Sequence, residues 1–349
     1  MKITFWQNIV SIHQVPLLNA LSNHKGIAID LIVSESIPEY RKSLGWVHLE
    51  NKKFNLIYLN DIKNPKEYIS SRDFHIFSGF CAYKRLNSFF VECLKYNNVY
   101  IYSEGKDDRG LKGKLRLIKD KFNYLKYGKN VRGVFAIGDK GVSWYNKIGF
   151  KNKKIKKFGY FTDSIILESN FKNTSRYLFV GRLVESKGIL NILEVFSYDS
   201  NKNRIIDIYG NGPLEAEVRE ASDNNININY KGVVNNSELK SELLNYDYLL
   251  LPNTGDEGWG AVINEALLSG LKIICSKNTG ANCLVKASGF GIVLDQVNNN
   301  ALNDALISLE NLNINKDTIF QWSVNNISPE IGAKYFYSVL NNKEVKIKW

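Results

Sequence analysis

YLFVGRLVESKGILNILEVF, residues 177–196, contains the local pattern on which the fold depends. Its first residues, YLFVG, have the length and the β-branched and aromatic content of a buried strand. After a polar turn, Ile189, Ile192, Leu193 and Phe196 recur at the spacing of one helix face. A buried strand followed by an amphipathic helix is the first half of a βαβ unit, in which successive strands are parallel.

The same order of strand and helix repeats on both sides of this stretch. Short apolar runs alternate with segments of helical spacing, which predicts an α/β protein with parallel sheets covered by helices on both faces. In such sheets ligands bind at the carboxyl ends of the strands. The expected strands are KITFW, IAIDLIV, FNLIYL, FHIFSG, NVYIYSEG and GVFAIG in the first half, and YLFVG, RIIDIYG, NININYKG, YDYLLLP, KIICS and GIVL in the second.

The length of 349 residues exceeds what one ordinary core holds and suits two domains. The segment KFGYFTDSIILESNFKNTSR separates the two series of strands and is polar toward its end. We place the boundary there and expect two Rossmann-like, doubly wound domains, residues 1–163 and 164–330, facing a cleft.

The composition is that of a soluble globular protein. The chain is 44% hydrophobic and 23% charged, and it contains no apolar run of the ~18 residues that a membrane span requires. The first residues lack the apolar stretch of a secretory signal, so we expect a cytoplasmic location. The four cysteines show no metal-ligand spacing and fit reduced, scattered thiols: Cys81, Cys93, Cys275 and Cys283.

Positive charge is concentrated in the first half of the chain. Residues 1–168 hold 29 Lys and Arg against 15 Asp and Glu, a net +14, whereas residues 169–349 hold 17 against 20, a net −3. Such a surface favours a polyanion, an anionic membrane face or a phosphorylated substrate. Nucleic-acid binding is the outside alternative, but the basic half lacks the Gly-rich loops and any recognised nucleic-acid module, so we expect no nucleic-acid partner.

Two loops at strand ends in the second half carry the features of an anion site. In the first, Gly181 precedes Arg182 and Lys187, and a helix follows. Two cations and the amides of a helix start would meet there. In the second loop, Gly210 and Gly212 allow close approach of backbone to a ligand. Taken singly, these residues also fit turn geometry and a solvated helix start.

A third loop, GDEGWGAVINEALLSG, contains two glutamates eight positions apart. Glu257 lies in a Gly-flanked turn and Glu265 within an apolar, helix-like run. A surface carboxylate on an amphipathic helix would explain Glu265 alone. The three loops together, each at a strand end, favour a nucleoside diphosphate site with cations on the phosphates and carboxylates on ribose and sugar.

These motifs resemble a known family. GRLVESKG, YGNGP, YKGVV and LLLPNTGDEGWGAVINEALLSGLKIICS are similar to the C-terminal domain of glycosyltransferase family four, retaining enzymes of the two-Rossmann-domain GT-B fold that use sugar nucleotides. The resemblance covers residues 176–290 closely, and the first 165 residues match in architecture. Trp259 stands where Phe is usual. The resemblance also implies that a terminal helix in residues 331–349 crosses back to the first domain.

The resemblance implies roles for individual residues. Arg182 and Lys187 would neutralise the donor diphosphate without a metal or other cofactor, and the absence of an Asp-x-Asp motif agrees with this. Glu265 would accept hydrogen bonds from ribose, and Glu257 from the transferred sugar. The base could be uracil or guanine, and we favour UDP as the nucleotide. Backbone at four positions would line the sugar and phosphates, and one position would contact the base: Gly258, Trp259, Gly260 and Ala261, and Val233.

The first half offers weaker candidates. Glu104 lies near the place where relatives carry a catalytic His, so we consider a catalytic role beside a helix-capping or surface role. His13 and Gln14 follow the first expected strand and Ser78 ends another, so these three could contact the acceptor. A lone His is also common as a structural residue.

LKGKLRLIKDKFNYLKY, residues 111–127, has the spacing of a basic amphipathic helix. Its apolar residues recur every three or four positions, and five lysines follow in the cluster KNKKIKK, residues 151–157. An ordinary surface helix with its apolar stripe packed on the domain is the alternative. We favour peripheral binding to the anionic cytoplasmic leaflet, with a lipid-linked saccharide acceptor. The apolar residues are Leu111, Leu115, Ile118, Phe122 and Leu125.

These observations predict a retaining, metal-independent hexosyltransferase that acts in surface polysaccharide, lipopolysaccharide or glycolipid biosynthesis. The donor would be a nucleoside-diphosphate hexose or amino-hexose. The alternative on the same fold is a sugar-nucleotide epimerase or a phosphorylase, and incubation with the nucleotide sugar alone would separate an epimerase from a transferase.

Overall fold

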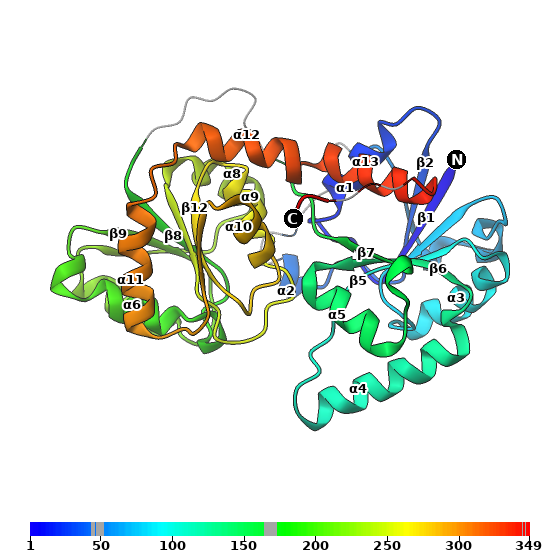
Figure 1. Ribbon diagram of the computed structural model, residues 1–349, viewed down its shortest axis with the longest axis horizontal. Coiled ribbons are helices and arrows are strands. Elements are labelled where there is room, and N and C mark those ends of the chain that lie inside the picture. Colours follow the sequence, from blue (N-terminus) through cyan, green and yellow to red (C-terminus); the bar gives the residue numbers. More distant parts are fainter. Residues whose placement is uncertain (43–45, 47–51, 164–172, 344, 346) are drawn as a thin grey trace. The chain divides into compact units, whose positions relative to one another are not determined.

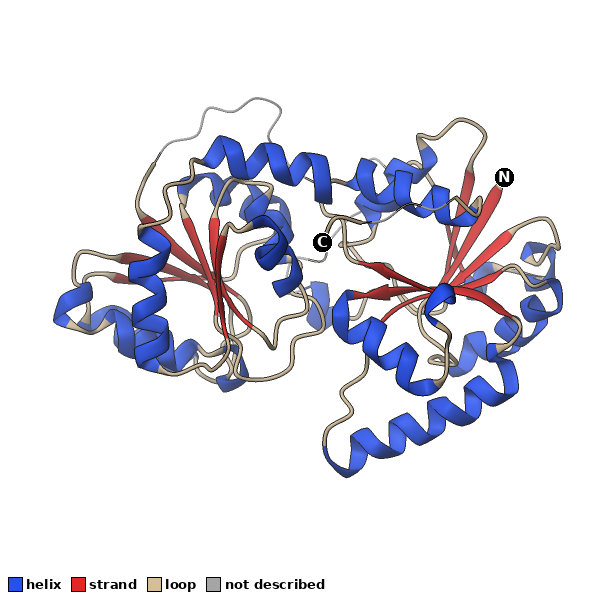
Figure 2. Cartoon of the chain, viewed as in Figure 1, coloured by secondary structure: helices blue, strands red, loops and turns tan. Residues whose placement is uncertain are grey.

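A computed structural model describes residues 1–42, 46, 52–163, 173–343, 345 and 347–349. Residues 1–42, 52–161 and 329–343 belong to one compact unit, and residues 162–163, 173–328 and 348–349 belong to a second. The boundary that we expected at residue 164 lies outside the described residues. Each unit contains one sheet with helices on both faces (Figures 1 and 2).

The sheet of the first unit is parallel throughout. Its strand order is β3-β2-β1-β4-β5-β6-β7. The strands are β1 Lys2–Gln7, β2 Ala28–Val33, β3 Asn55–Tyr58, β4 Phe74–Phe77, β5 Val99–Glu104, β6 Val131–Ile137 and β7 Ile155–Phe158. The helices are α1 Val15–Ser22, α2 Glu39–Lys42, α3 Asn87–Cys93, α4 Gly110–Asn123, α5 Gly138–Ile148 and α13 Pro329–Leu340.

The last helix, α13, lies in the first unit, where the family resemblance implied a terminal helix, and it spans Pro329–Leu340 instead of residues 331–349. Phe336 of α13 stacks on Phe5 of β1 and Phe135 of β6, with ring centroids 5.8 and 4.1 Å apart. All three side chains are buried, and aromatic pairs of this kind contribute about 0.5–1.5 kcal/mol beyond their buried area. The chain then returns to the second unit, where the indole N–H of Trp349 donates to the carbonyl oxygen of Asn326 at 3.2 Å.

The sheet of the second unit is also parallel, with the strand order β10-β9-β8-β11-β12-β13. Its strands are β8 Arg176–Val180, β9 Ile205–Tyr209, β10 Ile228–Gly232, β11 Tyr248–Leu251, β12 Lys272–Ser276 and β13 Gly291–Leu294. Its helices are α6 Ile189–Phe196, α7 Glu215–Asn224, α8 Asn236–Glu242, α9 Val262–Leu267, α10 Asn282–Ser288, α11 Asn299–Glu310 and α12 Lys316–Ile327.

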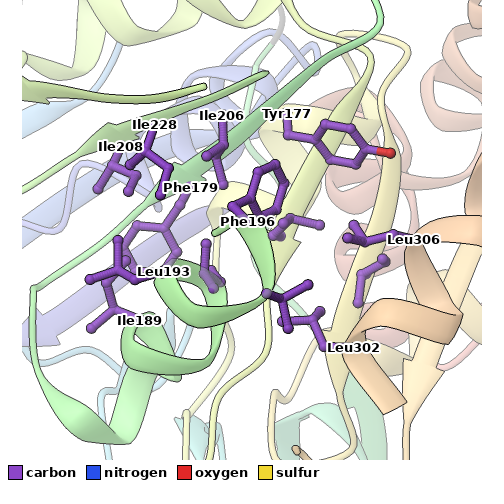
Figure 3. Close-up of a cluster of buried hydrophobic side chains, with 14 of the residues drawn as sticks. Tyr177, Phe179, Ile189, Leu193, Phe196, Ile206, Ile208, Ile228, Leu302 and Leu306 are labelled. Carbon is purple, nitrogen blue, oxygen red and sulfur yellow. The ribbon is translucent and has the colours of Figure 1, made fainter. Parts of the chain in front are cut away.

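The stretch 177–196 forms the strand, turn and helix that its pattern predicted. Ile189, Leu193 and Phe196 of α6 pack with residues of β8 and β9 in a buried cluster (Figure 3). Leu302 and Leu306 of α11 complete this cluster. Burying one such side chain contributes about 1.5–3 kcal/mol, so the apolar face of α6 fixes how the polar loop before it leaves the sheet.

All twelve predicted strands are present, and the first sheet contains one further strand, β7, that the sequence pattern did not predict. Strand β7 pairs with β6 and overlaps the cluster KNKKIKK, whose lysines favour a basic surface segment. Only Ile155 and Phe158 of β7 are buried, and lysines occupy the positions between them. An edge strand of four residues needs little apolar sequence, so its pattern was hidden by the lysines. Within the described part of the chain, no helix has the length and apolarity to cross a lipid bilayer.

Candidate functional site

The candidate site of the second unit lies where its strand order reverses. Strands β8 and β11 are neighbours, whereas the chain runs from β8 to β9 on one side and from β11 to β12 on the other. In open α/β sheets, the crevice at the carboxyl ends of two such strands is where ligands bind. The loop 181–188 leaves β8, and the loop 252–261 leaves β11, so two of the three predicted Gly-rich loops border this crevice.

Backbone contacts hold these two loops together. The amide of Gly255 donates to the carbonyl oxygen of Ser186 at 3.0 Å, and the hydroxyl of Thr254 donates to the carbonyl oxygen of Glu185, also at 3.0 Å. Gly188 has φ +69°, and a Cβ at this position would lie 2.1 Å from the carbonyl oxygen of Pro252. Only glycine allows this approach, which aims the residues before α6 at the loop after β11.

An ion pair joins the charged residues of the two loops. The ammonium group of Lys187 lies against the carboxylate of Glu257, and their side chains are 18% and 25% exposed. Arg182 is exposed on the same loop as Lys187. The structure therefore brings together two of the residues assigned to neighbouring groups of a sugar nucleotide, the diphosphate and the transferred sugar. An anionic ligand reaching Lys187 would compete with Glu257 for it.

The loop after β9 packs against the loop after β8. The amide of Gly181 donates to the carbonyl oxygen of Tyr209 at 3.1 Å, and that of Leu183 donates to Asn211 at 2.8 Å. A Cβ on Gly210, whose φ is +141°, would lie 1.8 Å from the carbonyl oxygen of Gly181. Glycine is thus required at this position because the two loops contact each other there. The motif alone did not reveal this requirement. A Cβ on Gly212 would similarly lie 2.4 Å from the carbonyl oxygen of Leu183.

Val233 lies beside this loop. It follows β10 and is 45% exposed, and the amide of Gly210 donates to the carbonyl oxygen of Gly232 at 2.8 Å. The position assigned to the base is therefore next to the loop of β9.

Glu265 is almost completely buried on α9, with 4% of its surface exposed. Burial raises the pKa of its carboxyl group from 4.5 to about 7, and the negative charge of Asp163 acts in the same direction. The positive charge of Lys240 and a hydrogen bond from Asn236 partly offset this rise in pKa. A buried carboxyl group poised near neutrality is typical of a functional position rather than of a surface helix.

The aromatic residue of the motif supports the loop from inside. The indole of Trp259 is 1% exposed, its N–H donates to the amide oxygen of Asn264 at 2.7 Å, and its ring packs on Trp349 with centroids 5.7 Å apart. Because the Trp259 side chain is buried, its aromatic ring is not exposed to a ligand. Any contact of Trp259 with a ligand would come from its backbone, as for the neighbouring Gly258, Gly260 and Ala261.

The loop after β12 is a part of the site that the sequence analysis missed. The amide of Glu257 donates to Asn278 at 3.0 Å, and the amide of Ala281 donates to Trp259 at 2.8 Å, in each case to the carbonyl oxygen. Asn253, 1% exposed, donates to the hydroxyl of Thr279 at 2.9 Å. These hydrogen bonds hold the turn that contains Glu257 against the loop after β12. A signal was present, because NTG follows the strand KIICS and again places polar residues at a strand end.

The first unit contains its own polar cavity of about 340 Å³. It lies at the carboxyl ends of β1, β4, β5 and β6, and its lining includes Gln14, Ser78 and Glu104. The hydroxyl of Tyr160, also in the lining, donates to the carboxylate of Glu104 at 3.1 Å. Burial and the charge of Glu104 hold the pKa of Tyr160 well above its usual range, so the phenol remains a donor. The ring of His13 is not in the lining, and its centroid lies 6.1 Å from that of Tyr160.

The part of the chain that the structure describes contains no group of three or more His, Cys, Asp or Glu side chains arranged to hold a metal ion. The polar groups that border the two sites are amides, hydroxyls, single carboxylates and cations, which include Arg41 in the lining of the first unit's cavity. Such groups suit a ligand with hydroxyl and phosphate oxygens.

Comparisons with known proteins relate the chain to sugar-transferring enzymes. Residues 164–325 match the family model of the glycosyl transferases group 1. No curated protein sequence matches the chain. Among solved structures, Anabaena HepE in complex with UDP has a TM-score of 0.72 at 12% identity, covering 98% of this chain and 100% of that one. A glycosyltransferase from Rickettsia africae has a TM-score of 0.66 at 16% identity, covering 98% of both chains. The lipopolysaccharide outer core galactosyltransferase WaaB has a TM-score of 0.62 at 14% identity, covering 98% of this chain and 99% of that one.

Proposed function

We propose that this chain, whose second unit belongs to the glycosyl transferases of group 1 and which has their two-domain GT-B fold, transfers a hexose or amino-hexose from a nucleoside-diphosphate sugar to a saccharide acceptor. The observation that carries the proposal is the ion pair of Lys187 and Glu257 at the switch point of the second sheet, with the buried Glu265 on the helix that follows. This arrangement offers a cation to phosphates and carboxylates to hydroxyl groups.

Donor binding would exchange one partner of Lys187 for another. The β-phosphate would take the place of the Glu257 carboxylate, and the released carboxylate would accept hydrogen bonds from the hydroxyls of the transferred sugar. Arg182 would add a second positive charge on the diphosphate. Because both cations are in position before reaction, they would stabilise the charge that develops on the leaving phosphate without reorganisation.

The nucleoside would be held by the opposite end of the site. Glu265 would accept from the ribose hydroxyls, and the backbone at Val233 would face the base. We favour UDP as the nucleotide, because crystal structures of the similarly folded HepE are in complex with UDP and with UDP-glucose. The resemblance to retaining transferases supports substitution on one face of the sugar, with the leaving phosphate assisting deprotonation of the acceptor, and no step requires a metal.

The acceptor would bind the polar cavity of the first unit. Gln14 and Ser78 offer hydrogen-bonding groups to saccharide hydroxyls, and Tyr160 orients Glu104 in the same cavity. A basic first half is consistent with an acceptor carried on a lipid at the cytoplasmic face of a membrane. We therefore place the enzyme in surface polysaccharide or glycolipid assembly.

Calorimetry with UDP and a panel of UDP- and GDP-sugars tests the donor assignment. Replacing Lys187 by alanine should weaken UDP binding by about 1.5–3 kcal/mol, roughly 10- to 100-fold in Kd, because a charge-assisted bond to phosphate is lost. Arg182→Ala should have a similar effect, and Lys202→Ala, an exposed lysine away from the site, should have none. Absence of binding to every nucleotide, or unchanged affinity in both loop variants, would contradict the proposal.

A further inference from the structure

Helix α4 has an unusual orientation on the first unit. Its apolar row faces solvent, with exposed fractions of 81% for Leu111, 66% for Leu115, 51% for Ile118 and 68% for Phe122. Leu125, in the π-helical turn that follows α4, is 72% exposed. The alternative of an ordinary surface helix packing this row on its domain is thus wrong. Figure 1 shows α4 at the periphery of the first unit, beside α5.

The inward side of α4 is firmly fixed, and it includes Leu117, which packs against the buried core of the first unit. Asp120, 1% exposed, accepts from the ammonium group of Lys106 at 2.7 Å and from the indole N–H of Trp144 at 3.2 Å. A Cβ on Gly113 would lie 2.2 Å from the backbone carbon of Asp108, so the helix backbone rests directly on the preceding segment. Turning the apolar row inward would break these contacts and bury cations.

Basic residues border the apolar row on both sides. Because an α-helix advances about 100° per residue, the four exposed apolar residues of α4 lie within about 60° of arc, with cations to either side. The only acid in residues 110–127 is Asp120, which is buried and paired. The cations are Lys112, Lys114, Arg116, Lys119, Lys121 and Lys126, all exposed.

The second basic cluster contributes less than its sequence suggested. The ammonium group of Lys154 donates to the carbonyl oxygens of Lys129 and Val131, at 3.0 and 2.6 Å, and Lys157 pairs with Asp139 at 2.7 Å. These two lysines hold the turn before β6 and the start of α5. Lys151 and Lys153 remain exposed in residues 151–157.

We propose that α4 docks on the anionic surface of a lipid bilayer, lying in the plane of the interface with its apolar row inserted among the acyl chains. A row of large apolar side chains bordered by cations matches an interface that is apolar below and negatively charged above. A second copy of this chain is a poorer occupant, because pairing two such helices would bring two sets of six cations together. The inference goes beyond the proposed function and would stand if the donor assignment failed.

Sedimentation of the full chain with vesicles tests the proposal. One set contains phosphatidylcholine alone, and the other contains three parts phosphatidylcholine to one part phosphatidylglycerol. The protein should partition to the anionic vesicles, and raising the ionic strength should weaken this binding. Equal partition to both sets, or no binding to either, would overturn the proposal.

Two groups of substitutions separate the apolar from the ionic contribution. A triple change of apolar residues to glutamine should lower partition by more than about tenfold. A triple change of lysines should lower it on anionic vesicles by about two orders of magnitude, since each basic residue contributes roughly fivefold. The apolar set is Leu115→Gln, Ile118→Gln and Phe122→Gln, and the basic set is Lys114→Gln, Lys119→Gln and Lys121→Gln.

Matched controls lie elsewhere on the chain. Ile226→Gln replaces a 97% exposed apolar side chain, and a triple change of three exposed lysines removes the same charge as the basic set. Neither control should alter partition, and all variants should keep the melting temperature and UDP affinity of the wild type. Unchanged partition in the apolar set would overturn insertion. A dimer that this set dissociates, without vesicle binding, would identify a second copy as the occupant. The control lysines are Lys202, Lys286 and Lys334.

Discussion

Replacing Glu265 by glutamine should stabilise the second unit, and the gain should depend on pH. The pKa of this carboxyl group is raised by burial from 4.5 to about 7, whereas in the unfolded chain it returns to its ordinary value. Between these two values the unfolded state has lost a proton that the folded state keeps. The free energy of unfolding of the wild type therefore falls as pH rises through this window, and the loss is complete above pH 7.

The magnitude follows from the size of the pKa difference. At about 1.4 kcal/mol per pKa unit, a rise from 4.5 to about 7 corresponds to roughly 3 kcal/mol of lost stability. Glutamine has the same shape and no charge to desolvate, so the variant should avoid this loss. We expect the two proteins to differ little in pH dependence below pH 4.5, and Glu265→Gln to gain roughly 3 kcal/mol relative to the wild type by pH 8.

Urea unfolding of both proteins at several pH values measures this difference. Taking the difference between variant and wild type at each pH cancels the contribution of the first unit, which is the same in both. Glu217→Gln, an exposed glutamate on α7, supplies the same change in charge and should show no such gain. A stability difference that stays constant from pH 4 to pH 8 would refute the reasoning. The variant should also bind UDP more weakly, since it lacks the proposed charged acceptor for ribose.

Gly188→Ala should destabilise the second unit by more than Gly289→Ala. Both positions have similar positive φ, +69° and +73°, which costs a residue with a Cβ about 1–2 kcal/mol. At Gly188 the added Cβ would also collide with the carbonyl oxygen of Pro252, whereas at Gly289 it would meet no atom within 4 Å. Equal losses in melting temperature for the two variants would contradict the contact with Pro252. Glu104→Gln should lower kcat of sugar transfer by about 100-fold or more if Glu104 handles a proton. Glu104→Gln should keep the UDP affinity of the wild type in calorimetry, and the exposed control Glu67→Gln should keep its turnover. If Glu104→Gln turns over substrate at close to the wild-type rate, Glu104 is not a catalytic residue.

The fold was predictable because local and global signals agree along most of this chain. Most buried strands are apolar runs of ordinary length, and most helices before or after them have an apolar face, as in residues 177–196. The edge strand β7 escaped because only two of its residues are buried. The strand order reverses between β8 and β11, which the alternation of strands and helices does not specify, since pairing depends on contacts between residues far apart in sequence.

The sequence predicted the residue types of the candidate site, but it predicted less about which of them are paired or buried. Arg182, Lys187 and Glu257 stand at strand ends in the sequence, but the ion pair between two of them follows from the approach of the loops at Gly188. Burial of Trp259 was likewise hidden, because its partner Trp349 lies 90 positions further along the chain. Spacing identifies candidates within one loop, whereas burial and pairing are set by segments that only the folded chain brings together.

Helix α4 also shows that sequence spacing does not specify which residues are buried, because here the apolar row is exposed. A period of three to four residues identifies an amphipathic helix, but it does not say which side faces the protein. Here the inward side carries Leu117, which packs on the core, together with Asp120 and Gly113. The contacts of Asp120 and Gly113 with Lys106, Trp144 and Asp108 hold this side inward, so the exposed apolar row faces outward. Burying Asp120 is tolerated because it is paired, since an unpaired buried carboxylate would be costly. Breaking this pairing by Lys106→Ala should therefore weaken the attachment of α4 and reduce partition to anionic vesicles, although the row and its cations are unchanged in sequence.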